Sequence, residues 1–278
     1  MNRSAFCCPV CGGALAHTGG ALRCCKGHSF DLAKEGYAHL LPASRMRSKA
    51  PGDSKEMVAA RHAFLQSGAY APFAEALAGL CAAAPAAGKE LHILDAGCGE
   101  GYYDAAVCAA LAGAGRLFCL AGWDIAKPAV RLAAKRRLPC AEFAVASSFA
   151  APVAGGWADL ALNVFSPFAR SEFLRCLAPG GRLIYAVPTA DHLMGLKAVL
   201  YDRPYENPVR QIGYEGFIQT GEQEVKAQLR AEGAQVQALF AMTPYYWKTP
   251  ADGAARLARQ TVLETPIGFR FLVFQKQS

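Results

Sequence analysis

The chain lacks two features that would place it in a membrane or on the secretory pathway. It has no positively charged N-terminal segment followed by an apolar stretch, which argues against a secretory signal. It also has no apolar run long enough to span a bilayer, since the alanine-rich stretch 82–87 is short and is interrupted by Pro85. We therefore expect a cytoplasmic protein with no membrane partner.

Internal repeats, a low-complexity tail and the cysteine pattern of a secreted disulfide framework are also missing. These absences exclude a solenoid and favour a reducing compartment. Six of the eleven cysteines are scattered singly through apolar segments: Cys81, Cys98, Cys108, Cys119, Cys140 and Cys176. With 278 residues, 53% of them hydrophobic, the chain is long enough for one large α/β domain and a small appendage.

Four metal-ligating residues are concentrated near the N-terminus. Cys8, Cys11, Cys24 and His28 form a CxxC–x12–CxxxH array, a spacing typical of a tetrahedral zinc ion held by two short turns. Four protein ligands leave no position for a catalytic water, so we expect the zinc to be structural. The neighbouring cysteines at positions 7 and 25 leave open which thiols are the ligands.

The positive charge is concentrated in the first part of the chain. Residues 1–62 hold nine Lys and Arg against four Asp and Glu, which accounts for +5 of the net charge of +7. Within this part, Arg45, Arg47 and Lys49 lie between Pro42 and Pro51 and predict an exposed, non-helical basic connector. Such a connector is suited to nucleic-acid phosphates, although a solvated loop explains the charges equally well.

Two amphipathic helices are predicted after the connector. Asp53 and Glu56 resemble a capping box, followed by apolar residues at helical spacing up to Gly68. A second apolar series, from Phe73 to Cys81, precedes Gly88. We expect these helices to bridge a zinc-binding module of residues 1–42 to a third region at 89–278, with residues 43–88 forming the connector and bridging helices.

From Leu91 onward, short apolar strands alternate with helical stretches, which predicts an α/β domain with a parallel sheet covered on both faces. A buried strand ends at Asp95 and leads into a glycine-rich turn with Gly97, Gly99 and Gly101. A dinucleotide-binding turn would place its third glycine at position 102, where this chain has Tyr102. The GxGxG form preceded by an acid favours S-adenosylmethionine, which has no pyrophosphate.

Polar residues at the ends of the following strands support this interpretation. The strand 117–124 ends at Asp124, which can accept hydrogen bonds from both ribose hydroxyls. The strand 142–145 leads to Ser147 and Ser148, where adenine contacts are expected. The strand 158–164 presents Asn163 beside the methyl donor, and 177–184 predicts a helix end, a turn and a fifth strand. This order is that of a class I, Rossmann-like methyltransferase.

Taken together, these motifs resemble those of the bacterial 23S rRNA (guanine-N1) methyltransferases. The resemblance rests on the zinc array, segments 27–37, 40–42 and 51–53, Arg61, and segments 95–103, 192–193 and 242–244. It implies an N-terminal zinc module that helps to recognise 23S rRNA and a class I domain that methylates guanosine N1 in a hairpin. It also implies His192 and Tyr102 as cofactor-binding residues, and it leaves a homodimer open.

The acceptor side of the site is less well defined by the sequence. A flipped guanine needs an aromatic pocket, for which the candidates are Phe165, Phe168, Tyr245, Tyr246 and Trp247, each with core packing as the alternative. No carboxylate is identified as the base, and His192 is either a base or a structural hydrogen-bonding residue. Segment 163–168 is similar to the macrolide-resistance branch of the family, but the methylated guanosine is not determined.

Two other functions explain part of the sequence. A small-molecule methyltransferase accounts for the predicted cofactor site alone. A non-catalytic RNA-binding protein on a methyltransferase scaffold accounts for the basic region but leaves the cofactor site without a role.

Overall fold

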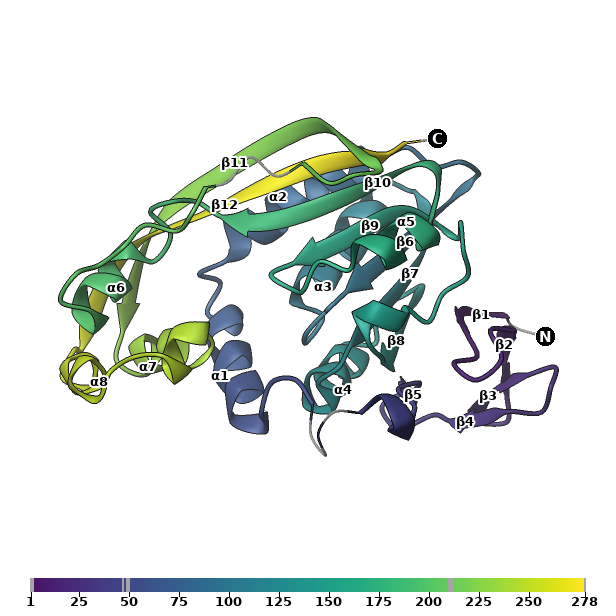
Figure 1. The fold of residues 1–278 in the computed structure, drawn as a ribbon, viewed down its shortest axis with the longest axis horizontal. Helices are drawn as coiled ribbons and strands as arrows, with labels where there is room; N and C mark the ends of the chain where they lie inside the picture. The colour runs from purple at the N-terminus through teal and green to yellow at the C-terminus, as the bar shows by residue number, and fades with distance from the viewer. Residues whose placement is uncertain (1–2, 47, 49–50, 210–212, 278) are drawn as a thin grey trace.

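A computed structural model of the chain describes residues 3–46, 48, 51–209 and 213–277, which form a four-stranded and an eight-stranded sheet with flanking helices (Figure 1). The small sheet and helices α6 to α8 lie at opposite ends of the long axis of the molecule. Arg47 and Lys49 of the predicted connector lie outside the described residues, whereas Ala43–Arg45 forms a short 3₁₀ turn, η1.

The small sheet is antiparallel and contains the zinc array. Its strands are β1 (Arg3–Cys7), β2 (Ala14–Thr18), β3 (Ala21–Cys24) and β4 (Ser29–Asp31), in that order. Gly19 and Gly20, both with positive φ, form the tight turn between β2 and β3. The next strand, β5 (Ala38–His39), leaves this sheet and pairs with β8 of the large sheet, although the sequence-based division assigned residues up to 42 to the zinc module.

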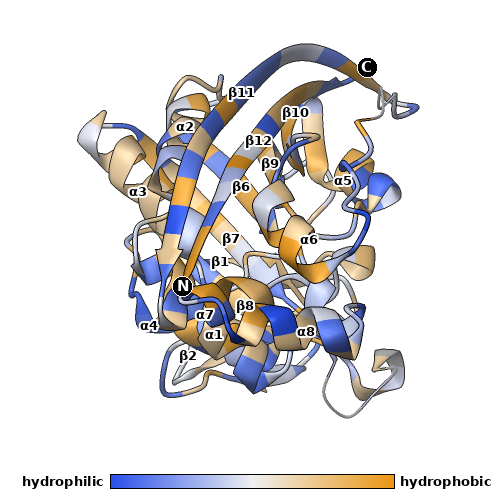
Figure 2. Ribbon diagram, turned by 90° about the vertical axis from the view of Figure 1, so that its left-hand side faces the viewer, coloured by the Kyte–Doolittle hydropathy of each residue, from blue (hydrophilic) through white to orange (hydrophobic). Residues whose placement is uncertain are grey.

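The large sheet has the order β11-β12-β10-β9-β6-β7-β8-β5. Its remaining strands are β6 (Glu90–Ala96), β7 (Leu117–Asp124), β8 (Ala141–Val145), β9 (Ala158–Val164), β10 (Leu177–Pro188), β11 (Phe217–Glu232) and β12 (Val262–Lys276). The predicted parallel sheet is confirmed for the strands from β10 to β5, whereas β12 departs from it and runs antiparallel to both β10 and β11. Much of β11 is exposed at the sheet edge, and hydrophilic residues interrupt its hydrophobic ones along the strand, so it lacks the apolar run of a buried strand (Figure 2).

The helices cover this sheet and close one end of the molecule. They are α1 (Lys55–Gln66), α2 (Ala71–Ala82), α3 (Tyr102–Gly113), α4 (Lys127–Lys135), α5 (Arg170–Cys176), α6 (Met194–Leu200), α7 (Ala234–Ala241) and α8 (Ala251–Ala258), with 3₁₀ turns η2 (Ser148–Ala150) and η3 (Pro244–Trp247). The predicted capping box is wrong by one residue. Ser54 caps α1 by accepting from the Met57 amide, whereas Asp53 pairs with Arg61. In the described part of the chain, no helix is long and apolar enough to cross a membrane.

The small sheet is fixed to the large one by apolar and polar contacts. Phe6 and Leu22 belong to the same apolar cluster as Trp123 and Val153 of the large domain. Glu142 of β8 accepts hydrogen bonds from the Ser4 hydroxyl and the Ala5 amide and lies 2.8 Å from His17 Nε2; these three residues all come from the small sheet. The zinc module is therefore held in a defined orientation relative to the sheet that carries the site.

Candidate cofactor and metal sites

The strand order reverses between β6 and β9, and the carboxyl ends of these two strands are the expected position of a ligand crevice. From β6 the chain proceeds to β7 and β8 on one side, and β9 and β10 lie on the other side of β6. Ligands of open α/β sheets bind where the strand order reverses in this way. The structure places the predicted glycine turn, Asp124 and Asn163 at this end of the sheet, on β6, β7 and β9 and the turns that follow them.

The glycine turn is shaped for close approach by a ligand. Gly97, Gly99 and Gly101 all have positive φ, and the Gly97 and Cys98 amides donate to the Trp123 carbonyl of the neighbouring strand. A Cβ atom at Gly99 would meet no atom within 4 Å, so this face of the turn is open. At Gly97 a Cβ atom would lie 2.4 Å from the Ser166 Cβ, so only glycine fits there.

Asp124 is half-buried and is held against the glycine turn. Its Oδ2 accepts from the Gly99 amide at 3.1 Å, and its Oδ1 accepts from the Ala126 amide at 2.8 Å. Burial raises the pKa of this carboxyl above its usual value. Each carboxylate oxygen keeps a lone pair free, which fits the two hydroxyls of a ribose beside the open face of Gly99.

A buried ion-pair cluster on Glu100 supports the turn, and sequence reasoning missed it. Glu100 is 2% exposed, and its carboxylate lies 2.7 Å from Arg136, the residue that follows α4, and 2.6 Å from His62 of α1. Arg136 also donates to the Glu100 carbonyl at 2.7 Å. Glu100 therefore connects the turn to α1 and to the end of α4, and in the sequence only the position of an acid between two glycines indicated this role.

Two carboxyl groups are buried under the turn. Asp95 and Asp104 are 2% and 0% exposed, and Asp95 Oδ1 and both Asp104 oxygens lack a hydrogen-bond partner among the described residues. Burial raises the pKa of Asp104 to about 7, and burial together with the neighbouring Asp104 raises the pKa of Asp95 well above its usual value. At neutral pH the pair of carboxyl groups therefore retains a proton.

This shift predicts a pH-dependent stability. The pKa of Asp104 is about 7 in the folded chain and near 3.8 without burial. Its contribution to the free energy of unfolding is therefore full below pH 4 and is lost as the pH rises through 7. We expect the Tm of the cofactor-free chain to fall by several degrees between pH 5 and pH 7.5, and to fall less in Asp104→Asn. Asp252→Asn, at an exposed position on α8, is the control. Thermal unfolding measures the Tm at each pH, and an equal dependence of Tm on pH in the two variants would refute the raised pKa of Asp104.

The two predicted polar residues on the other strand ends have local partners. Ser147 caps η2 by accepting from the Phe149 amide at 3.2 Å. Asn163 is fully buried, and its Nδ2 donates to Ser166 Oγ at 2.8 Å and to the Pro167 carbonyl at 3.2 Å. Its Oδ1 has no partner among the described residues, so it is a candidate acceptor at the crevice.

His192 lies behind an exposed aromatic ring. Phe165, 48% exposed and with φ of 53°, stacks on the His192 ring with centroids 6.3 Å apart. His192 Nδ1 accepts from the Gly268 amide at 3.1 Å, and burial, with the nearby Lys197 charge, lowers the pKa of His192 to about 4. The neutral ring therefore carries its proton on Nε2, which is a donor and not a base.

The other predicted aromatic residues divide into packed and exposed groups. Phe168 stacks face to face on Tyr214 at 3.7 Å, so it has the packing role. Tyr245 is partly buried, whereas Tyr246 and Trp247 of η3 are 46% and 68% exposed. Tyr102, the first residue of α3, is partly buried with its ring edge to Tyr103.

The zinc array has the geometry of a tetrahedral site. The ligand atoms of Cys8, Cys11, Cys24 and His28 all lie within 4.8 Å of one another. The distance between Cys11 and Cys24 sulfurs is 3.7 Å, and His28 Nδ1 lies 3.5 Å from the Cys8 sulfur and 3.3 Å from the Cys24 sulfur. Ordinary zinc bond lengths require edges of about 3.8 Å between sulfurs and about 3.6 Å between sulfur and nitrogen. The residues present therefore fit zinc.

The neighbouring thiols are not part of this cluster. Cys25 is exposed and Cys7 is partly buried, and neither joins the four-residue group. The Cys7 amide instead donates to the Pro152 carbonyl at 2.6 Å, which helps to fix β1 to the large domain.

Comparisons with known proteins agree with this architecture. Residues 6–49 match the family model described as RlmA, N-terminal, a zinc ribbon. The chain is 37% identical over 255 residues to the 23S rRNA (guanine(748)-N(1))-methyltransferase of Streptomyces fradiae, covering 90% of this chain and 88% of that protein. The chain belongs to the 23S rRNA (guanine-N1) methyltransferase family. It is an S-adenosylmethionine-dependent methyltransferase with a structural zinc site.

Further relatives are similar over a comparable length. The chain is 36% identical to a putative 23S rRNA (guanine-N(1)-)-methyltransferase of Micromonospora griseorubida, over 94% of this chain and 92% of that one. Among solved structures, it is similar to a putative methyltransferase from Bacillus halodurans with a TM-score of 0.48 and 12% identity, covering 73% of this chain and 99% of that one.

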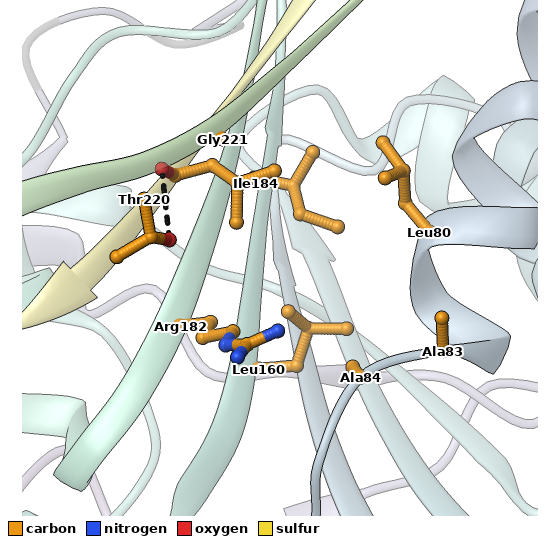
Figure 3. A pocket seen from close by; sticks show the side chains of 9 residues that line it. Leu80, Ala83, Ala84, Leu160, Arg182, Ile184, Thr220 and Gly221 are labelled. Carbon is orange, nitrogen blue, oxygen red and sulfur yellow. Dashed lines mark hydrogen bonds between the residues drawn. The ribbon is translucent and has the colours of Figure 1, made fainter.

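A separate cavity lies away from these residues. It has a volume of about 200 Å³ and is lined by side chains near the amino ends of β9 and β10, among them Leu160, Arg182 and Ile184, and by the end of α2 (Figure 3). The lining is mostly aliphatic, and it contains no glycine turn or strand-end acid. This cavity is therefore not the cofactor site.

Proposed function

We propose that this protein transfers a methyl group from S-adenosylmethionine to N1 of a guanosine in a hairpin of 23S rRNA. The observation that carries the proposal is that the cofactor site and the zinc module are attached to the same sheet. The cofactor crevice on β6, β7 and β9 is bordered by the exposed ring of Phe165, and the zinc module is held against the same sheet through β8. The printed names of the relatives support this substrate.

We propose that the cofactor is bound by residues of the crevice named from the sequence. Gly97, Gly99 and Gly101 would line its path, Asp124 would accept from the ribose, and Ser147 would border the adenine. Asp95, Tyr102, Asn163 and His192 would lie around the methionine end. When bound, the cofactor supplies an electrophilic methyl group.

The chain's own groups then orient the acceptor. The Phe165 ring offers an exposed face on which a flipped guanine can stack, and His192 Nε2–H is a donor suited to a base carbonyl oxygen. A guanine that accepts a methyl group at N1 must lose the N1 proton. Since His192 is a donor and Asp95 and Asp104 are buried, we assign the proton to water, and positioning remains the main catalytic contribution.

We propose that the guanosine is the one named for the Streptomyces relative, position 748, because identity to that protein is highest among the relatives compared above. N1-methylguanosine cannot form a Watson–Crick pair, so reverse transcriptase stops at it. We expect a stop at this guanosine in 23S rRNA incubated with the protein and cofactor. Methyl transfer to a small molecule, with no mark on the RNA, would favour the small-molecule alternative.

We further propose a cytoplasmic location, 23S rRNA as the partner, and zinc ligation by Cys8, Cys11, Cys24 and His28. A homodimer stays a prediction that sedimentation would test. For the domain limits we propose that the zinc module ends near Gly36, because Tyr37 and Ala38 are buried and β5 belongs to the large sheet.

Replacing Asp124 with alanine tests the ribose assignment. We expect cofactor binding to weaken by about 1.5–3 kcal/mol, the cost of losing charge-assisted hydrogen bonds, which is roughly a 10- to 150-fold rise in Kd. Calorimetry measures the Kd, and zinc content should not change. An unaltered Kd would show that the ribose lies elsewhere.

Replacing Cys24 with serine tests the metal site. Because the small sheet has few apolar residues and the four ligands converge in it, we expect loss of the zinc ion and unfolding of residues 3–31. The matched control is Cys25→Ser, which changes the adjacent exposed thiol and should retain zinc in elemental analysis. Loss of zinc from the control would reassign the ligand.

A further inference from the structure

Lys197 of α6 is a fully buried lysine in a part of the fold that the mechanism above does not use. It is 0% exposed, and its Nζ donates to the Tyr205 carbonyl at 2.9 Å and to Asn207 Oδ1 at 2.7 Å. The ammonium also lies 4.6 Å from the centroid of the Tyr205 ring and 5.6 Å from that of the Tyr245 ring. Both hydrogen-bond acceptors are neutral oxygens, and burial lowers the pKa of Lys197 more than the Glu206 carboxylate raises it, so the charge is incompletely compensated.

The partner of Lys197, Asn207, is the centre of a hydrogen-bond network. Its Nδ2 donates to the Thr189 carbonyl at 2.9 Å and to the His192 carbonyl at 3.0 Å, and its backbone amide donates to the Ala190 carbonyl at 2.9 Å. The Tyr245 hydroxyl donates to Asn207 Oδ1 at 3.4 Å. One side chain therefore joins the turn 189–192, the segment 205–207 and η3.

This turn is the one that carries His192. It is fixed to β12 by the Gly268 amide on His192 Nδ1 and by the Leu193 amide on the Pro266 carbonyl, and Leu193 itself has a positive φ of 59°. The backbone carbonyls on its other side are bound by Asn207. Because Asn207 Oδ1 is held by Lys197, the amide must present its Nδ2 to these carbonyls and not the reverse.

We propose that Lys197 is a positioning residue for the acceptor side of the site: through Asn207 it fixes the turn 189–192 and thereby the orientation of His192 behind Phe165. This inference rests on the proposed function. Lys197 is not itself a base or a substrate contact, since it is enclosed by Tyr205, Asn207 and Tyr245. A buried ammonium hydrogen-bonded only to neutral oxygens is unfavourable for stability, and such departures from good packing are expected at functional sites.

Two variants test the proposal from different sides. Lys197→Met keeps a long unbranched side chain and removes the ammonium. Asn207→Asp keeps an acceptor for Lys197 but removes the donor to the Thr189 and His192 carbonyls. Lys89→Met is the matched control, because Lys89 is an exposed lysine just before the amino end of β6, whereas the turn 189–192 follows the carboxyl end of the parallel strand β10.

The readouts are the ¹⁵N chemical shifts of the His192 ring, the Kd for S-adenosylmethionine, and kcat and KM for methylation of 23S rRNA. In the parent chain we expect the shifts of a neutral ring protonated at Nε2. In both variants we expect these shifts to move toward the average of the two tautomers and kcat to fall at least tenfold. KM should change less than threefold, and zinc content should be retained. The control should match the parent in every measurement.

The proposal is overturned if both folded variants keep parental His192 shifts and a kcat within twofold of the parent. If Lys197→Met fails to fold, Asn207→Asp decides; if both fail, Lys197 stabilises the whole domain and the local role is refuted. The ring shifts need no RNA. A parent chain that binds the cofactor but does not methylate 23S rRNA would therefore refute the proposed function without obscuring this test.

Discussion

A triple alanine variant at Arg23, Lys26 and Lys34 is expected to bind 23S rRNA about 10²-fold more weakly than the parent at about 0.1 M salt. All three side chains are exposed on the zinc module, and none takes part in an ion pair among the residues that the structure describes. They are therefore free to contact phosphates. Binding releases fewer counterions when three phosphate contacts are lost. The slope of log K against log salt should therefore become shallower by about two to three.

The matched control changes the same number of cations on the opposite part of the molecule. Lys226, Arg230 and Arg256 each lie within 3.1 Å of a carboxylate, so their charges are already compensated. Their alanine variants should change rRNA affinity by less than threefold. Cofactor affinity should be parental in both triple variants. Equal losses of rRNA affinity in the two triple variants would show that the cations of the zinc module contribute no more to RNA binding than the control cations do.

The elements that could be predicted from the sequence are those whose signal is local. The strand predicted at 117–124 coincides with β7 and that at 158–164 with β9, because a buried strand is a continuous apolar run with clear ends. The glycine turn and the start of α3 at Tyr102 follow from positions where only glycine accepts a positive φ. The zinc cluster was predictable because ligand spacing fixes its geometry.

The features that could not be predicted depend on residues far apart in the sequence. Glu100 contacts His62 and Arg136, and Asn207 contacts Lys197 and the turn that carries His192. A single acid or amide in a loop gives no indication of these partners. The antiparallel direction of β12 was missed for a similar reason, since it depends on how the polar strand β11 and helices α7 and α8 return the chain to the sheet.

Replacing Gly97 with alanine is expected to abolish cofactor binding, with a rise in Kd of at least about 100-fold, and to lower the Tm. The φ of +91° is unfavourable for alanine by roughly 1–3 kcal/mol. The new Cβ would also lie 2.4 Å from Ser166 Cβ and 2.8 Å from its Oγ. Ser166 donates to the Ala96 carbonyl and accepts from Asn163, so its displacement disturbs both strand ends at the crevice.

A second alanine separates this clash from simple obstruction of the site. Gly99→Ala should also block the cofactor, because its Cβ would enter the open face of the turn, but it meets no protein atom within 4 Å and should lower the Tm less. Adding Ser166→Gly removes the Ser166 Cβ and Oγ atoms, which would clash with a Cβ at position 97 but not with one at position 99. The double variant Gly97→Ala/Ser166→Gly should therefore recover part of the lost Tm, whereas Gly99→Ala/Ser166→Gly should recover none. Calorimetry and thermal unfolding of the four proteins measure both effects, and equal behaviour of the two double variants would contradict the packing of Ser166 against Gly97.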